Sequence, residues 1–263
     1  MRGGSKWLVA ASVVAGLGVG VLAVLTRMRR IRLAASATLN ESLPVNSAWW
    51  RAHAKEKGEL LYVALGDSAA QGIGASRPER GYVGILAERI AGRSGRTVRT
   101  VNLSVSGATV GQAVDYQLPR LAKRSPDIVT VSIGANDIAT WDATAFERAL
   151  TAVLDALPPH SIVADLPCFY LPRNERKVAE ANDILRRLAT ERDLSVAPLH
   201  ALTAAPGLLG ALAMFAGDRF HPNDTGYRVW ASAFAPLVDH RIDELLASRT
   251  AADPTGTTRS GDV

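Results

Sequence analysis

Several short segments of the sequence carry side chains that together could transfer an acyl group to a serine. They supply a hydroxyl, an imidazole, a carboxylate, a glycine amide and a side-chain amide, at Ser68, His221, Asp218, Gly107 and Asn136. Acyl transfer needs a nucleophile, a base that takes its proton, and donors that stabilise the oxyanion formed on the substrate. The five groups together meet these needs, so the combination is far more specific than any one member.

Each group taken alone also has an ordinary structural interpretation. Asp67 or Ser68 could cap a helix that follows a strand, because both side chains accept hydrogen bonds from free N–H groups. Asn136 could be a turn residue after Gly-Ala, and Asp218 with His221 could be a loop ion pair. These alternatives weaken only when the positions of all the groups are considered together.

A second histidine competes for the role of base. His200 also follows an apolar run, but no acid stands near it in the sequence to orient its ring. The remaining histidines, at positions 53, 160 and 240, are expected at the surface. Asp67 and Asp137 are expected to brace the loops in which they lie.

Short apolar runs alternate with segments of helical spacing through most of the chain. The runs are rich in Val, Ile and Leu and predict buried parallel strands at residues 60–66, 97–105, 126–134, 161–167 and 194–199. Helical spacing covers residues 82–93, 110–124, 143–156, 174–192 and 225–247, with Pro119 expected to kink or end the second helix. This alternation predicts a doubly wound α/β sheet with helices on both faces. Ligands bind such sheets outside the carboxyl ends of the strands, where Ser68, Gly107 and Asn136 are expected.

The sequence resembles the SGNH hydrolases, also called GDSL esterases and lipases. The resemblance rests on GDS at 66–68, the glycine of SVSGA at 107, GAND at 134–137 and DRFH at 218–221, in the usual order of the family's four motif blocks. It covers about residues 59–245 and departs from the GDSL motif at Ala69, a position that many members vary. It implies a flavodoxin-like three-layer α/β/α fold with a central parallel sheet of about five strands. It also implies hydrolysis of carboxylic esters or thioesters, without a cofactor or a metal.

The roles of the site residues follow from that resemblance and from the chemistry. Ser68 is the expected nucleophile, His221 the base, and Asp218 the acid that fixes the imidazole tautomer. The oxyanion hole is expected to consist of the Ser68 amide, the Gly107 amide and the Asn136 side chain. Gly107 is expected to be small so that its backbone can reach the substrate.

Charge and motif content argue against several other classes of protein. Six of the 30 basic side chains lie in residues 1–40, which hold no acid, so residues 41–263 carry 24 basic against 25 acidic side chains. That balance gives no excess for nucleic-acid binding. Cys168 is the only cysteine, which excludes an internal disulfide and a cysteine metal cluster. The chain also lacks the G-x-S-x-G elbow and the glycine-rich phosphate-binding motifs.

The N-terminal segment predicts a membrane anchor. Residues 7–26 form an uncharged run of 20 residues, which as a helix would rise about 30 Å and match a bilayer core. Ala35-Ser36-Ala37 resembles a signal-peptide cleavage site, but the arginines at 27–32 favour an uncleaved anchor. Two basic residues before the span and four after it favour the cytoplasmic face for the rest of the chain. The expected divisions are an anchor with basic flanks at 1–32, a linker at 33–58, the hydrolase domain at 59–247 and a disordered tail at 248–263.

The sequence restricts the substrate only loosely. The apolar segment at residues 201–217 and the Cys168–Leu171 segment are both expected near the site, where they could form an acyl-chain groove or lid. The 201–217 segment could equally be an ordinary helix packed on the core. The predicted substrates are small-molecule or lipid-like acyl esters. An acyltransferase or carbohydrate O-acyl esterase on the same fold is the main alternative, and a non-catalytic membrane-tethered binding protein is a further one.

Overall fold

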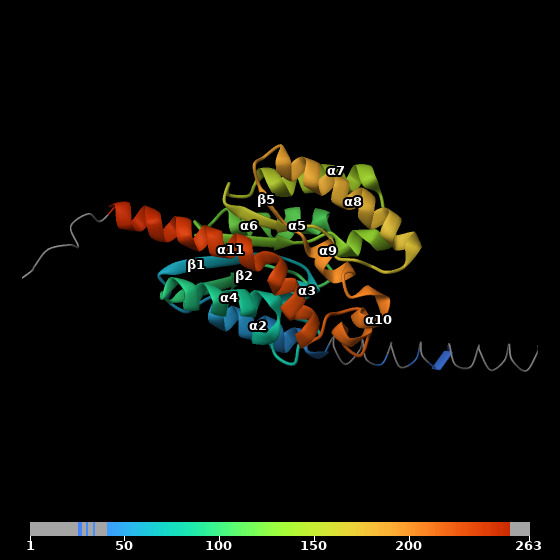
Figure 1. The fold of residues 1–263 in the computed structure, drawn as a ribbon. Coiled ribbons are helices and arrows are strands. Elements are labelled where there is room, and N and C mark those ends of the chain that lie inside the picture. Colours follow the sequence, from blue (N-terminus) through green and yellow to red (C-terminus); the bar gives the residue numbers. More distant parts are fainter. Residues whose placement is uncertain (1–25, 28–29, 31–33, 35–40, 253–263) are drawn as a thin grey trace, which may run out of the picture.

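A parallel sheet forms the centre of the chain in the computed structural model, which describes residues 26–27, 30, 34 and 41–252 (Figure 1). Within these residues the sheet has five strands in the order β2-β1-β3-β4-β5. The strands are β1 (Leu60–Gly66), β2 (Val98–Asn102), β3 (Ile128–Ser132), β4 (Ser161–Ala164) and β5 (Ser195–Ala197). This is the flavodoxin-like strand order, and it confirms the predicted fold.

Helices cover both faces of the sheet, as the alternation of strands and helices predicted. The helices are α2 (Leu43–His53), α3 (Ser68–Gln71), α4 (Tyr82–Ser94), α5 (Val110–Tyr116), α6 (Leu118–Leu121), α7 (Ala143–Asp155), α8 (Pro172–Thr190), α9 (Leu199–Ala204), α10 (Gly207–Ala211) and α11 (Asp224–Ala252). Short 3-10 turns are η1 (Pro78–Arg80), η2 (Ala135–Thr140) and η3 (Leu212–Met214). In Figure 1, α7 and α8 lie above the sheet, whereas α2 and α4 lie below it.

The alternation of side chains along β1 builds two separate cores. Val63 and Leu65 face the core beneath α5, α7 and α8, whereas Tyr62 and Ala64 face the core beneath α2, α4 and α11. Successive side chains of a strand point to opposite faces, so a strand that is apolar throughout must be covered on both sides. β1 is buried on both faces and ends at a fixed place between its neighbours β2 and β3.

Pro119 ends a helix, as predicted. α5 stops at Tyr116 and the short α6 begins at Leu118, with Gln117 between them. Gln117 is fully buried, and its side chain accepts from the Gly66 N–H at 2.9 Å and donates to the Gly66 C=O at 2.8 Å. The interruption of the helix therefore provides a side chain that holds the end of β1.

Two of the predicted boundary segments contain helix. α2 lies within the expected linker at 33–58, and its Trp50 is buried against the core. α11 continues to Ala252, beyond the expected start of the tail at residue 248. Residues 253–263 lie outside the described residues.

The structure contradicts the predicted location, which was membrane-anchored on the cytoplasmic face. In the part of the chain that the structure describes, no helix is both long enough and apolar enough to cross a membrane. Apart from Thr26, the span expected at residues 7–26 lies outside the described residues. The prediction depended on a run of uncharged residues and on the basic residues that flank it, which establish hydropathy and charge but not a membrane-spanning helix.

Candidate active site

Ser68 lies where β1 ends and α3 begins. Asp67 caps this short helix, because its Oδ1 accepts a hydrogen bond from the Ala69 N–H at 2.9 Å. Ser68 is the first residue of α3 and is largely buried. The expectation that Asp67 braces its loop is therefore confirmed, and the cap sets the direction in which the next residue points.

The Ser68 hydroxyl is joined to a histidine and an aspartate that lie far away in the sequence. His221 Nε2 lies 3.0 Å from Ser68 Oγ, and His221 Nδ1 lies 2.6 Å from Asp218 Oδ2. A carboxylate at Nδ1 selects the tautomer with a proton on Nδ1, which leaves the Nε2 lone pair facing the serine hydroxyl. The three side chains thus form a continuous hydrogen-bonded chain, and the structure brings these predicted residues together.

The loop that carries His221 is fixed by its own hydrogen bonds. Asp218 Oδ1 accepts from the N–H groups of Phe220 and His221, both at 3.0 Å. The loop is closed at its base by the Ala216 N–H, which donates to the His221 C=O at 2.8 Å. The Asp218 carboxylate therefore uses one oxygen to shape the loop and the other to hold the imidazole.

Gly74 allows the His221 loop to approach the Ser68 segment. Its φ is +95°, and a Cβ atom there would lie 2.4 Å from the Pro222 carbonyl oxygen and 3.0 Å from His221 Cβ. Any larger side chain would push the loop outward, away from Ser68.

The pKa values of the two aspartates of the site are shifted in opposite directions from the ordinary value of an aspartate. Burial raises the pKa of Asp218, but hydrogen bonds from the His221 ring and from the Phe220 and His221 N–H groups outweigh it, so the pKa lies below its ordinary value. Burial raises the pKa of Asp67 to about 6, against the Ala69 N–H bond and the attraction of His221, which lower it. Asp218 thus stays ionised beside the imidazole, whereas Asp67 takes up a proton in mildly acidic solution.

Asn136 lies in η2 and points its amide toward Asp67. Its Nδ2 donates to Asp67 Oδ2 at 3.2 Å and to the Ala108 C=O at 3.0 Å. Both amide hydrogens therefore have acceptors, and the longer bond, to Asp67, is the easier one to exchange for a substrate oxygen. Asp137 accepts from the Val110 N–H at 3.1 Å, so it braces the loop as expected.

Gly107 lies in an exposed turn after β2, where its backbone conformation favours a glycine. A Cβ atom at Gly107 would meet no heavy atom within 4 Å, but φ is +77°, which strains any other residue. The turn is closed by the Ala108 N–H, which donates to the Val105 C=O at 3.0 Å. The positive φ therefore accounts for a glycine in this turn, and the expectation that its small size lets the backbone reach the substrate stays a prediction.

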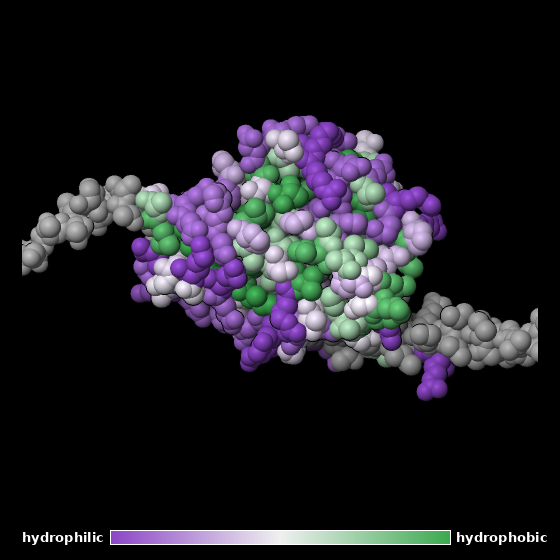
Figure 2. Space-filling model, in the orientation of Figure 1, coloured by the Kyte–Doolittle hydropathy of each residue, from purple (hydrophilic) through white to green (hydrophobic). Residues whose placement is uncertain are grey.

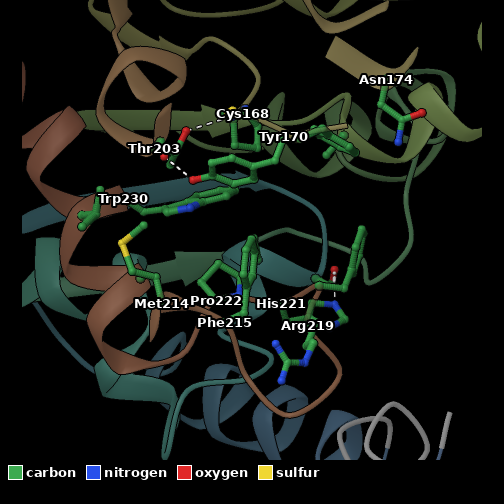
Figure 3. A pocket seen from close by; sticks show the side chains of 18 of the residues that line it. Cys168, Tyr170, Asn174, Thr203, Met214, Phe215, Arg219, His221, Pro222 and Trp230 are labelled. Atoms are coloured by element: carbon green, nitrogen blue, oxygen red, sulfur yellow. Dashed lines mark hydrogen bonds between the residues drawn. The ribbon is translucent and has the colours of Figure 1, made fainter. Parts of the chain in front are cut away.

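A cavity of about 330 Å³ opens beside the Ser68 hydroxyl (Figure 3). Ser68, Asn136 and His221 line one part of it, whereas Gly107 is not among the lining residues. Most of the remaining wall is apolar or aromatic and includes Phe169, Tyr170, Leu208, Leu212, Met214, Phe215 and Trp230. A small polar end and a large apolar wall are typical of a site that binds a mainly apolar ligand.

The 201–217 segment combines the two structures that the sequence left open. α9 packs on the core through Leu199 and Thr203, which are buried. Much of α10 stays exposed, with Leu208 at 58% and Leu209 at 84% of their possible accessible surface, whereas Ala211 is buried. In Figure 2 this exposed apolar area lies over α9 and α10, to the right of centre.

His200 does not lie near the serine. Its Nε2 is 3.0 Å from Glu175 Oε2, and its N–H donates to Asp165 Oδ1 at 2.7 Å. Glu175 stands 25 residues before His200 in the sequence, so sequence proximity could not identify it as the partner. His221, and not His200, is the histidine that contacts Ser68.

A model of the GDSL-like lipase/acylhydrolase family matches residues 64–229, which is more than half of the chain. The chain belongs to this family. It is a hydrolase that acts on ester bonds, as the sequence predicted. No curated protein matches the sequence.

Solved structures with the same fold include several esterases. LAE5, an α/β hydrolase from the metagenome of Lake Arreo in Spain, is 23% identical over 70% of this chain and 96% of its own, with a TM-score of 0.58. TesA is 22% identical over 69% of this chain and 99% of its own, with a TM-score of 0.57. Axe2, an acetylxylan esterase from Geobacillus stearothermophilus, is 21% identical over 68% of this chain and 94% of its own, with a TM-score of 0.58. At these identities the likeness supports the fold alone.

α2 lies outside the residues that the family model matches, but it contacts the segment that carries Ser68. Asn46 Nδ2 and Trp50 Nε1 both donate to the Gln71 C=O, at 3.0 and 3.1 Å. Gln71 is the last residue of α3, and its own side chain donates to the Ser104 C=O at 2.7 Å. All three donors are buried, so α2 holds the far end of the helix that Ser68 begins.

Removing one of these donors should affect catalysis as well as folding. Trp50→Phe keeps most of the packing and deletes the indole N–H, so we expect the free energy of unfolding to fall by about 1 kcal/mol. We expect kcat to fall about threefold to tenfold with little change in KM, because small shifts of a nucleophile are costly. Urea unfolding and steady-state kinetics on one ester measure the two effects.

Trp49→Phe is the matched control. Trp49 is the neighbouring residue of α2 and is half-buried; its ring stacks on His53 and packs edge-on against Trp50, whereas the hydrogen bonds from α2 to Gln71 come from Asn46 and Trp50. Trp49→Phe should leave kcat unchanged. Equal kcat values for Trp50→Phe and Trp49→Phe would show that α2 does not position Ser68.

Proposed function

We propose that the protein hydrolyses acyl esters through Ser68, His221 and Asp218, by way of an acyl-enzyme. The observation that carries this proposal is the hydrogen-bonded chain from Asp218 through His221 to Ser68 at the edge of the cavity. The two hydrogen bonds measure 2.6 Å, from Asp218 to His221, and 3.0 Å, from His221 to Ser68. Both lie within the range of about 2.6–3.2 Å that a nucleophile and its base need. The family supplies ester hydrolysis, and these residues supply a route to it.

The reaction proceeds in two halves. Ser68 Oγ attacks the acyl carbonyl carbon while its proton passes to His221 Nε2, and the carbonyl oxygen becomes an oxyanion. His221 then gives the proton to the leaving alcohol or thiol, and the bond to that group breaks. Water, deprotonated by the same imidazole, attacks the acyl-enzyme and releases the acid and Ser68. Throughout, the ionised Asp218 stabilises the imidazolium.

Asn136 is the proposed side-chain donor to the oxyanion, with the amides of Ser68 and Gly107 as backbone donors. In the resting site Asn136 donates to Asp67 at 3.2 Å and to Ala108 at 3.0 Å. The oxyanion would replace Asp67 as acceptor of the longer of these two bonds, because a donor already aimed into the site stabilises charge that develops on the substrate where there is little water.

The proposed substrates are esters or thioesters with an apolar acyl group of short to medium length. The aromatic and aliphatic wall of the cavity supports this choice, since it offers few partners for a polar acyl chain. A sugar acetate, as for Axe2, would place its small acyl group in the same cavity and fill little of it. The apolar wall therefore favours longer acyl groups over acetate.

Substitution of the proposed catalytic residues should give a ranked loss of activity on one fixed ester. Ser68→Ala should leave only background, and His221→Ala should come close to it, because residues that act as one unit lose activity together. Asp218→Ala should be milder, since the imidazole survives. Asn136→Ala should lower kcat roughly 10²- to 10³-fold with little change in KM. Steady-state kinetics on folded variants measure the ranking.

His240→Ala and His200→Ala complete this series. His240 is exposed on α11, so its substitution controls for the loss of a histidine in general. His200→Ala tests the competing base and should cost little in kcat. A folded His200→Ala variant as inactive as His221→Ala would contradict the assignment of the base, and an Asn136→Ala effect on KM alone would contradict the oxyanion hole.

The length of the acyl chain should set kcat/KM. Each methylene buried in the cavity contributes about 0.8 kcal/mol, so kcat/KM should rise about fourfold per methylene until the cavity is full. Leu212→Trp narrows the cavity, so the acyl chain that gives the highest kcat/KM should become shorter. Hydrolysis of a graded series of p-nitrophenyl esters measures the profile.

Leu209→Trp is the control for the acyl-chain series. Leu209 lies on the same exposed segment but does not line the cavity. It should keep the wild-type profile. A profile that falls from acetate onward, or that Leu209→Trp changes as much as Leu212→Trp does, would rule out this cavity as the acyl site.

A further inference from the structure

Three side chains that commonly bind metal ions meet beside the cavity, and one of them, Cys168, lines it. The ligand atoms of Cys168, Glu175 and His200 all lie within 4.8 Å of one another, and His200 Nε2 is 3.0 Å from Glu175 Oε2. Cys168 follows β4, Glu175 lies in the first turn of α8, and His200 lies in α9. Three separate elements therefore bring a sulfur, an oxygen and a nitrogen to one point.

Each of the three residues is held from outside the cluster by hydrogen bonds that do not use the atom it would offer to a metal. The Cys168 N–H donates to Thr203 Oγ1 at 2.9 Å, a contact drawn in Figure 3. Glu175 Oε1 accepts from the Phe169 and Tyr170 N–H groups, which leaves Oε2 facing His200. The His200 N–H donates to Asp165 Oδ1 at 2.7 Å. Outer hydrogen bonds of this kind orient metal ligands in proteins and raise their affinity for the metal.

The same three residues do not form a second nucleophilic site. The thiol of Cys168 hydrogen-bonds to Glu175 and not to His200, so the imidazole is not placed to take its proton. Burial raises the pKa of the Cys168 thiol, with a further contribution from the Glu175 charge. A nucleophilic cysteine needs a lowered pKa, whereas a metal ion can displace the proton of an ordinary thiol.

We propose that Cys168, Glu175 and His200 bind a divalent transition-metal ion, with Zn²⁺ the best match. Zn²⁺ accepts sulfur, nitrogen and oxygen ligands together, and three protein ligands leave a fourth tetrahedral position for water. Binding breaks the S–H bond of Cys168 and releases that proton to solvent. The proton between His200 and Glu175 moves to His200 Nδ1, which frees Nε2 as a ligand. A thiolate and a carboxylate then balance the two positive charges of the ion.

A bound ion would connect the segment after β4 to α8 and α9. Cys168, Tyr170 and Thr203 all line the acyl cavity, and the Tyr170 hydroxyl donates to the Thr203 C=O. The metal would therefore stiffen one wall of the cavity without touching Ser68. This links metal binding to access of the acyl chain, and the binding itself does not depend on the proposed catalytic roles.

Cobalt titration of the full chain tests the site directly. Co²⁺ occupies zinc sites, and a cobalt–thiolate bond gives a near-ultraviolet charge-transfer band. Because Cys168 is the only cysteine, that band reports on this site alone. We expect one equivalent of Co²⁺ to bind with the band, Zn²⁺ to remove the band by displacement, and the thermal midpoint to rise with metal concentration. Absence of the band in the wild-type protein would overturn the proposal.

Substitutions then separate a built site from a metal bound by an exposed thiol. Cys168→Ser should abolish the band, and Glu175→Gln and His200→Gln should each weaken cobalt binding at least about tenfold. His221→Gln should leave the band and the affinity unchanged, which controls for metal bound at the serine site. If the band and affinity persisted in both Glu175→Gln and His200→Gln, the thiol would be binding cobalt by itself and the proposal would be wrong.

Discussion

The hydrogen bond between His221 Nε2 and Ser68 Oγ joins two segments that lie 153 residues apart, and the rest of the structure serves to place its two ends. A bond of 3.0 Å allows little error in either segment. Ser68 depends on where β1 ends, which the parallel pairing with β2 and β3 and the Gln117 side chain determine. The position of His221 depends on its loop, which the Asp218 carboxylate shapes and which Gly74 allows to approach the Ser68 segment.

Much of this arrangement could be predicted from the sequence because it depends on local pattern. β1 has the predicted bounds, and each of the other strands lies inside its predicted range, since a strand buried on both faces must be apolar throughout. The parallel topology then brings the carboxyl ends together, so residues that follow different strands meet. Pro119 predicted a break whose consequence, the position of Gln117 against Gly66, depends on tertiary packing and has no signal in the sequence.

The sequence was less informative about contacts between residues that are far apart in the chain, and about the location of the protein. Glu175 beside His200 and the α2 donors to Gln71 are contacts across 25, 25 and 21 residues, with no motif to indicate them. The positive φ of Gly107, which favours a glycine in its turn, likewise has no signal in the sequence. The location was predicted from hydropathy and flanking charge and is not supported by any described helix. The apolar segment at 201–217 was ambiguous because part of it packs inward and part stays exposed.

Both proposed sites contribute residues to the lining of the acyl cavity, but the charges of their residues are balanced in different ways. At the serine, an ionised Asp218 stabilises a positive charge that forms on His221 during the reaction. At the cysteine, a half-buried thiol and the Glu175 carboxylate lie together beside the His200 ring. Tyr170 and Thr203 stand between the two sites, so the cavity wall is the physical link through which one could influence the other.

In the proposed mechanism, Ser68 carries the acyl group between the two halves of the reaction. The most direct measurement is to mix the protein with an activated ester, quench within one turnover, and locate the added acyl mass by peptide mass spectrometry. We expect one acyl group per chain, on the peptide that contains Ser68, which is lost with time in the wild-type protein and absent in Ser68→Ala. Turnover of the ester with no adduct on that peptide, or an adduct on Cys168 instead, would contradict it.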